Sequence, residues 1–168
     1  MKTRNLTMAV VILGVFGVLA ACKGGPTDPD LPTGSEVGQK AANFTAVSQS
    51  GQSVSLYSYL GKVVFIDFSA DWCGPCRSEA TTAEALYQSY KSQGLEMLTI
   101  LISGSTSEWA TQYGLTFPVL DDSATRIYNI YDEGYIPLNI VLDRNMIIRY
   151  KAVGYDEAAV VAAIKNYL

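Results

Sequence analysis

The chain has 168 residues, of which 49% are hydrophobic and 17% charged, enough for one domain with its own core and a leader segment. Its formal net charge is −4 at pH 7 and no stretch is strongly basic, which argues against a nucleic-acid partner because such binding needs clustered Lys and Arg. Histidine is absent, which excludes Ser-His-Asp triads, Cys-His pairs and His-rich metal sites.

Residues 1–21 have the composition of a signal peptide. Lys2 and Arg4 give a short positive start, and residues 9–19 form an uninterrupted apolar run. This run is too short to cross a bilayer, which takes about 20 residues, and suits the hydrophobic part of an export signal. A plain secretory signal cleaved after small residues, or a short core helix, are the other interpretations.

The leader ends in a Leu-Ala-Ala-Cys sequence at Cys22, which resembles the lipoprotein box of bacteria. The resemblance implies that Cys22 is acylated, becomes the mature N-terminus and anchors the protein to a membrane by lipid. It also implies a place in the bacterial cell envelope, on the periplasmic or extracytoplasmic face. Lys23, rather than an aspartate, follows the cysteine, which favours the outer membrane. Residues 22–35 are rich in Gly, Pro, Asp and Thr and are predicted to be a flexible tether.

From residue 36 to residue 168, strand-like and helix-like segments alternate. The hydrophobic pattern and the turn residues predict, in chain order, a hairpin (44–47 with 54–56), a buried strand (63–68), a helix (74–93) ended by Gly94, a second buried strand (95–102), a helix (107–113), a strand (116–120), a helix (123–131), a hairpin (138–143 with 146–150) and a final helix capped by Asp156. This order indicates a mixed sheet covered by helices on both faces.

Two cysteines remain for this domain once Cys22 is assigned to lipid. Cys73 and Cys76 enclose Gly74 and Pro75, directly after a predicted buried strand and at the start of a predicted helix. At a helix N-terminus, free N–H groups and the helix dipole stabilise a thiolate. Cys73 can therefore attack a substrate disulfide, and Cys76 can then resolve the mixed disulfide.

Residues 65–77, which contain Trp72 and the Cys-Gly-Pro-Cys motif, resemble the active-site segment of thioredoxins. Further stretches resemble the membrane-anchored TlpA/ResA-like branch of that superfamily. These stretches are the N-terminal extension (37–44 and 61–64), the middle strand (117–122) and the strand that follows a cis-proline (136–143). The resemblance covers residues 36–168. It implies a thioredoxin-like three-layer α/β/α sandwich with a mixed central sheet and an N-terminal β extension. It also implies a thiol–disulfide oxidoreductase in which the Cys73–Cys76 disulfide is the redox group, with no other cofactor and no metal.

The resemblance assigns roles to residues around the two cysteines. Asp67 matches the buried acid of thioredoxins, whose pKa burial should raise, so that it takes the proton of Cys76; hydrogen bonding to nearby backbone is the other interpretation. Glu79 matches an acid of the TlpA/ResA-like branch that tunes the cysteines or contacts substrate, although a solvated helix charge fits as well. Trp72, with Gly74 and Pro75, is expected to contact substrate. Partial burial of Trp72 in the core is the other interpretation, and both can hold.

Pro137 matches the cis-proline opposite the cysteines. In this arrangement the backbone of Ile136 pairs with an extended substrate segment. Two residues depart from the branch: Thr81 stands in place of a helix-kinking proline, which predicts a straighter helix, and Ala42 replaces a proline near the start of the domain.

Gly-Pro between the cysteines is the dipeptide of reducing thioredoxins, so we expect a reductase. Its partners would be disulfide-containing envelope proteins and an upstream membrane thiol reductant. Cytochrome c precursors are one class of such envelope proteins. A peroxiredoxin-like thiol peroxidase shares much of the fold, and a membrane-anchored binding module without catalysis is the plainer alternative. A structural zinc site needs four ligands, and the sequence offers only two thiols and no histidine. A copper carrier would need Met or His residues near the thiols, and none accompanies them.

Overall fold

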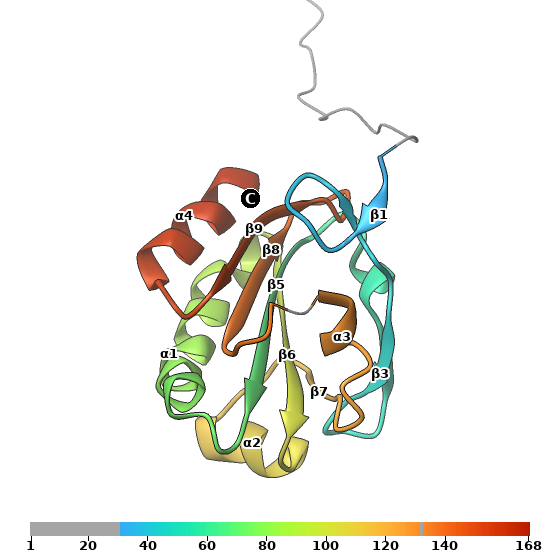
Figure 1. Ribbon diagram of the computed structural model, residues 1–168. Coiled ribbons are helices and arrows are strands. Elements are labelled where there is room, and N and C mark those ends of the chain that lie inside the picture. The colour runs from blue at the N-terminus through green and yellow to red at the C-terminus, as the bar shows by residue number, and fades with distance from the viewer. Residues whose placement is uncertain (1–30, 132) are drawn as a thin grey trace, which may run out of the picture.

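The computed structural model describes residues 31–131 and 133–168, so the predicted signal peptide, Cys22 and most of the predicted tether lie outside the described residues. The elements are arranged in the order drawn in Figure 1: β1 (Thr33–Gly34), β2 (Lys40–Ala41), β3 (Thr45–Val47), β4 (Ser53–Ser55), η1 (Leu56–Tyr59), β5 (Val63–Ala70), α1 (Gly74–Tyr90), η2 (Lys91–Gln93), β6 (Leu95–Ser103), α2 (Thr106–Tyr113), β7 (Val119–Asp121), α3 (Tyr128–Tyr131), β8 (Leu138–Leu142), β9 (Ile148–Val153) and α4 (Glu157–Tyr167).

The centre of the molecule is a mixed five-stranded sheet with the order β7-β6-β5-β8-β9. The strands β5, β6 and β7 are parallel, whereas β8 and β9 are antiparallel to their neighbours. Every residue of β5 is buried, as the continuous apolar sequence of this segment predicts for a strand covered on both faces. The predicted mixed sheet is confirmed.

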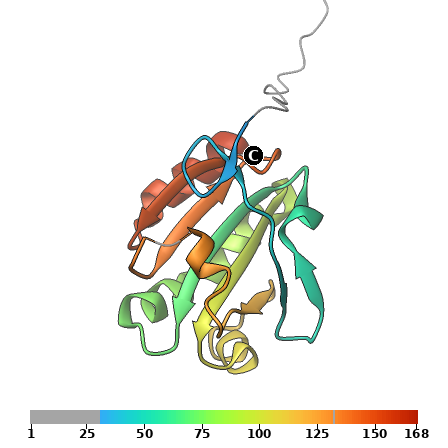
Figure 2. The same cartoon turned by 45° about the vertical axis from the view of Figure 1, so that its right-hand side comes forward.

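Helices and the N-terminal segments cover the sheet on both sides. One apolar cluster lies between the sheet and α1, α2 and α4, and the other lies between the sheet, α3 and the N-terminal segments. Figure 1 shows the sheet nearly edge-on, with α1 and α4 on one side and α3 and β3 on the other; in Figure 2, α3 and the N-terminal segments come to the front. The predicted three-layer sandwich is therefore confirmed.

The N-terminal β extension consists of two small sheets. β1 pairs with β2 in parallel, and β3 pairs with β4 as the predicted hairpin. Since Thr33 and Gly34 belong to β1, the folded domain begins before the expected end of the tether at residue 35. The backbone of Gly38 and Gln39 is hydrogen-bonded to Ile148, which attaches this segment to the outer strand β9.

Two elements are shorter than predicted. The predicted helix at 123–131 is reduced to α3, because Thr125 adopts a left-handed φ of 53° and the Asp122 carboxylate accepts the backbone N–H groups of Ile127 and Tyr128. The predicted strand at 116–120 begins only at Val119: the Thr116 N–H donates to the Glu84 carboxylate of α1 (2.8 Å) instead of to the sheet.

The boundaries of two other elements also move. The α-helix α1 ends at Tyr90, and a single 3-10 turn (η2) continues it to Gly94, which has the left-handed φ of 104° expected at a helix end. In the second hairpin, β9 runs from Ile148 to Val153 and not over 146–150, because the Asp143 carboxylate accepts the N–H groups of Asn145 and Ile147 and keeps them in the turn. The helix α1 is continuous through Thr81.

No helix within residues 31–131 and 133–168 has the length and apolar character needed to cross a membrane.

Candidate active site

Cys73 and Cys76 are joined by a disulfide at the start of α1. Cys73 is the N-cap residue of this helix, and its Sγ accepts the backbone N–H of Cys76 (3.2 Å). The first turn of α1 contains no acidic residue that would oppose a thiolate there. Pro75 occupies the first turn, where a missing N–H does no harm to the helix. Helix N–H groups and the helix dipole thus stabilise negative charge on Cys73 when the disulfide is reduced.

The loop before β8 faces the disulfide. The Ile136–Pro137 peptide bond is cis, as the resemblance implied. The carbonyl oxygen of Ile136 lies 4.0 Å from Cys73 Sγ. Ile136 is half-buried and Pro137 buried, whereas Gly74 and Pro75, between the two cysteines in the chain, are exposed. The structure therefore brings the backbone of Ile136 to the disulfide.

Two large side chains next to this contact are open to solvent. Trp72 is 66% exposed and belongs to neither apolar cluster, which agrees with the role of a contact surface. Tyr135, which the sequence analysis did not select, is 72% exposed and directly precedes Ile136. Exposed aromatic side chains suit a contact surface, because they present a large apolar area and lose little conformational freedom on binding.

The buried acid Asp67 lies in the middle of β5. Neighbouring residues at odd positions of this strand, Val63 and Phe65, belong to the apolar cluster that includes both cysteines, so Asp67 faces the same layer. Ser69 Oγ donates to the carboxylate (2.8 Å), and so does Thr99 Oγ1 (3.3 Å). Burial raises the pKa of Asp67 to about 7, although these two hydrogen bonds oppose the shift.

Glu79 is buried, with 3% of its surface exposed, and this contradicts the interpretation of a solvated helix charge. It follows Cys76 by one helical turn, and its inward direction is set by the face that Ala83 and Leu86 bury at helical spacing. Burial, together with the charge of Asp67, raises the pKa of Glu79 to about 10, and a hydrogen bond from Asn139 works against this. The upward direction of this shift favours the neutral acid form of Glu79 at pH 7.

Asn139, which the sequence does not single out, lies beside both acids. It is fully buried in β8, directly opposite Asp67 in the strand register. Its amide nitrogen donates to Glu79 Oε2 (3.3 Å) and to the Gly154 carbonyl (3.0 Å). One oxygen of each partner, Glu79 Oε1 and Asn139 Oδ1, is buried without a hydrogen-bond partner. The available signal was a single amide within the otherwise apolar run 138–142.

The loop that leads into α1 is held from β6. Asp71 receives a hydrogen bond from Ser103 Oγ (2.9 Å), and its own N–H donates to the Ser103 carbonyl (3.2 Å). Gly104 has a φ of 106°, and a Cβ placed on it would lie 2.8 Å from the Cβ of Asp71, so only glycine allows this approach. Arg77 donates to the Asp71 carbonyl (3.1 Å) from the helix side. The position of Cys73 is thus fixed from both elements.

No group of three or more Cys, Asp or Glu side chains in the described part of the chain is arranged to hold a metal ion. The predicted lipidation residue Cys22 lies outside the described residues, so its modification stays a prediction.

A mixed sheet covered on both faces, a Cys-x-x-Cys disulfide at the head of the first long helix and a cis-proline loop facing it define a thioredoxin-like protein. Residues 37–151 match the AhpC/TSA family, and the chain belongs to that family. This match confirms the resemblance to the thioredoxin superfamily that the sequence indicated.

Named relatives agree with this assignment. The chain is 35% identical over 112 residues to the thiol-disulfide oxidoreductase ResA of Geobacillus kaustophilus (65% of this chain and 64% of that protein). It is 30% identical over 122 residues to the protein of the same name from Bacillus cereus (71% and 70%). A thiol:disulfide interchange protein of the thioredoxin family from Chlorobium tepidum superimposes with a TM-score of 0.67 at 26% identity, covering 76% of this chain and 94% of that one. The first of these relatives is matched over slightly less than two thirds of its length.

Proposed function

We propose that this protein is a thiol–disulfide oxidoreductase that reduces disulfides of other proteins. The observation that carries the proposal is the Cys73–Cys76 disulfide at the N-terminus of α1, with Cys73 Sγ next to the Ile136 carbonyl. This geometry leaves the first sulfur beside a backbone with which an extended substrate can pair, while the second sulfur is completely buried.

In the reduced protein, the Cys73 thiolate attacks a substrate disulfide, forms a mixed disulfide and expels one substrate thiolate. Cys76 then loses its proton to a base, for which the Asp67 carboxylate is the candidate because its pKa of about 7 makes both forms accessible near neutral pH. The Cys76 thiolate attacks Cys73, the second substrate thiol leaves, and the Cys73–Cys76 disulfide forms again. Two electrons from an upstream thiol donor are needed to restore the dithiol.

The location and the partners belong to the same proposal. A lipid on Cys22 and an extended segment after it would hold the domain at the outer face of a bacterial membrane, where the substrates would be envelope proteins with disulfides. Cytochrome c precursors, whose paired cysteines must be reduced before haem attachment, are one such class. The ResA relatives and the sequence of the leader support this proposal.

Turnover of a protein disulfide, compared with turnover of hydrogen peroxide, tests the proposed activity. With dithiothreitol as electron donor, the purified domain should accelerate the reduction of insulin disulfides well above the rate of the donor alone. Peroxide consumption should stay at the background rate, because both sulfurs serve disulfide exchange. Rapid peroxide consumption without insulin reduction would identify a thiol peroxidase instead, and absence of both would favour a binding module.

A further inference from the structure

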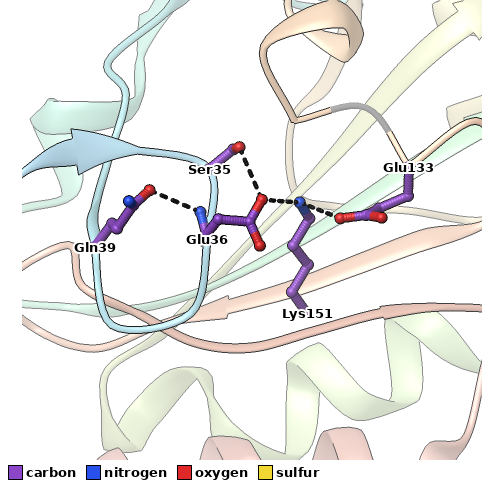
Figure 3. A network of polar contacts seen from close by, with 5 residues as sticks. All are labelled: Ser35, Glu36, Gln39, Glu133 and Lys151. Carbon is purple, nitrogen blue, oxygen red and sulfur yellow. Dashed lines mark hydrogen bonds and ion pairs between the residues drawn. The ribbon is translucent and has the colours of Figure 1, made fainter.

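A buried lysine outside the cysteine site connects three segments of the chain. The side chain of Lys151, in the outer strand β9, is only 5% exposed. Its Nζ lies 2.5 Å from Glu133 Oε1 and 3.3 Å from Glu36 Oε1. Figure 3 shows the ammonium group between the two carboxylates, which reach it from opposite sides. A buried ammonium group needs such partners, because an unpaired charge is costly to remove from water.

The first partner, Glu133, begins the loop that carries the contact residues. It precedes Ile136 by three residues, and the Ile136 carbonyl faces Cys73 Sγ. At its other end, the loop is fixed by a hydrogen bond from the Gly154 N–H to the Pro137 carbonyl (2.8 Å). The loop packs on the core through Ile136, which touches both apolar clusters, whereas the side chains of Glu133 and Tyr135 at its start are exposed. The ion pair with Lys151 is an attachment at the end of the loop that is farther from Pro137.

The second partner, Glu36, is itself held in place by hydrogen bonds. The Glu36 N–H donates to Gln39 Oε1 (3.0 Å), and Ser35 Oγ donates to Glu36 Oε1 (3.3 Å) (Figure 3). Gln39 can fold over in this way because residue 34 is glycine: a Cβ there would lie 2.0 Å from Gln39 Oε1. The turn that holds Glu36 is in turn attached to β9, since the Ile148 N–H donates to the Gln39 carbonyl (2.9 Å).

We propose that Lys151 is a positioning residue for substrate binding: by holding Glu133 against the anchored Glu36, it fixes the loop 133–137 so that the Ile136 backbone can pair with a protein substrate beside Cys73. The inference rests on the proposed function. Strand pairing with a substrate requires a backbone that is already ordered, because any disorder must be removed at the moment of binding. A small disulfide that makes no backbone pairing has no such requirement.

The test uses two variants. Lys151→Met keeps the aliphatic part of the side chain and removes its charge, and Glu133→Gln removes the charge of the partner in the loop. For reduction of a protein disulfide, both variants should raise KM about tenfold or more with little change in kcat, since a displaced contact backbone weakens binding before chemistry. The reaction with a small aromatic disulfide and the redox potential should stay unchanged. Lys151→Arg should restore most of the loss, and Lys62→Met, at an exposed lysine of the same protein, serves as the matched control.

A second readout does not depend on the activity. Amide hydrogen exchange at residues 135 and 136 should accelerate in Lys151→Met and Glu133→Gln and stay unchanged in β6. If Lys151→Met does not fold, Glu133→Gln decides, because its side chain is 42% exposed and its loss leaves no cavity. Unchanged KM and unchanged exchange would overturn the proposal, as would an equal loss of activity with the small disulfide. If the wild-type protein reduces no protein disulfide, the proposed function fails, and with it the role in substrate binding, while exchange still shows whether Lys151 holds the loop.

Discussion

Cys76→Ser is expected to stop turnover while leaving the first half of the reaction intact. Cys73, at the N-cap of α1, keeps its thiolate and still attacks a substrate disulfide, but no second thiol is present to release the product. The rate of protein disulfide reduction should fall by more than about 1,000-fold, because an intramolecular thiol acts at an effective concentration far above that of any thiol in solution. The variant should accumulate as a mixed disulfide with its substrate, visible on a non-reducing gel and by mass spectrometry.

The matched control is Cys73→Ser, which should lose the same turnover and accumulate no mixed disulfide. Cys76 is fully buried and its thiol cannot reach a protein substrate, whereas Cys73 is 4% exposed and lies beside the Ile136 carbonyl. A mixed disulfide on Cys76 in the Cys73→Ser variant, with none on Cys73 in the Cys76→Ser variant, would reverse the two roles and contradict the assignment.

Glu79→Gln is expected to stabilise the domain at neutral pH. The folded-state pKa values of Glu79, about 10, and Asp67, about 7, lie above those of an unfolded chain, so the folded state binds more protons. The stability these groups contribute is complete below about pH 4 and is lost as the pH rises through the folded-state values. Glutamine resembles the neutral acid and does not titrate, so the variant should gain on the order of 3 kcal/mol in free energy of unfolding at pH 7.

Urea unfolding of the oxidised domain between pH 4 and pH 9 measures this effect. Wild type should lose stability steadily with rising pH. Glu79→Gln should start from a similar stability at the acid end and lose less, because only Asp67 still titrates with a raised pKa, and its curve should level off above about pH 7. Glu84→Gln, on the same helix, is the control with the opposite sign: hydrogen bonds from Thr116 and Gln88 lower the pKa of Glu84 against the effect of burial, so this variant should lose stability above the unfolded pKa. A wild-type curve parallel to that of Glu79→Gln would show that Glu79 is ionised in the folded protein.

The sequence predicted the parts of the site that depend on local pattern. A buried strand, two cysteines three residues apart and a proline in the first turn of a helix are sufficient to place Cys73 at the helix N-terminus. The position of Glu79 could also have been derived, because Glu79, Ala83 and Leu86 follow helical spacing on one face. The pattern alone does not decide between a buried and a solvated Glu79, because carboxylates are seldom fully buried.

The remaining contacts join residues that are far apart in the chain. Asn139 comes to lie opposite Asp67 and beside Glu79 only after β8 has paired with β5. Both strands are continuous buried runs, so no alternation of polar and apolar residues indicates their register. The bridge from Glu36 through Lys151 to Glu133 likewise needs the N-terminal segment to lie beside β9. Short elements were predicted least well: α3 shrinks to one turn because side-chain contacts of Asp122 replace helical hydrogen bonds.

The equilibrium redox potential of the Cys73–Cys76 pair tests most directly whether this protein is a reductase. The purified domain is equilibrated with glutathione or dithiothreitol mixtures, and the fraction of dithiol is counted by mass after alkylation. The Gly-Pro dipeptide between the cysteines is that of reducing thioredoxins, so we predict a potential near that of thioredoxin, about −270 mV. A potential near that of the oxidant DsbA, about −120 mV, would contradict this account and identify a protein that introduces disulfides.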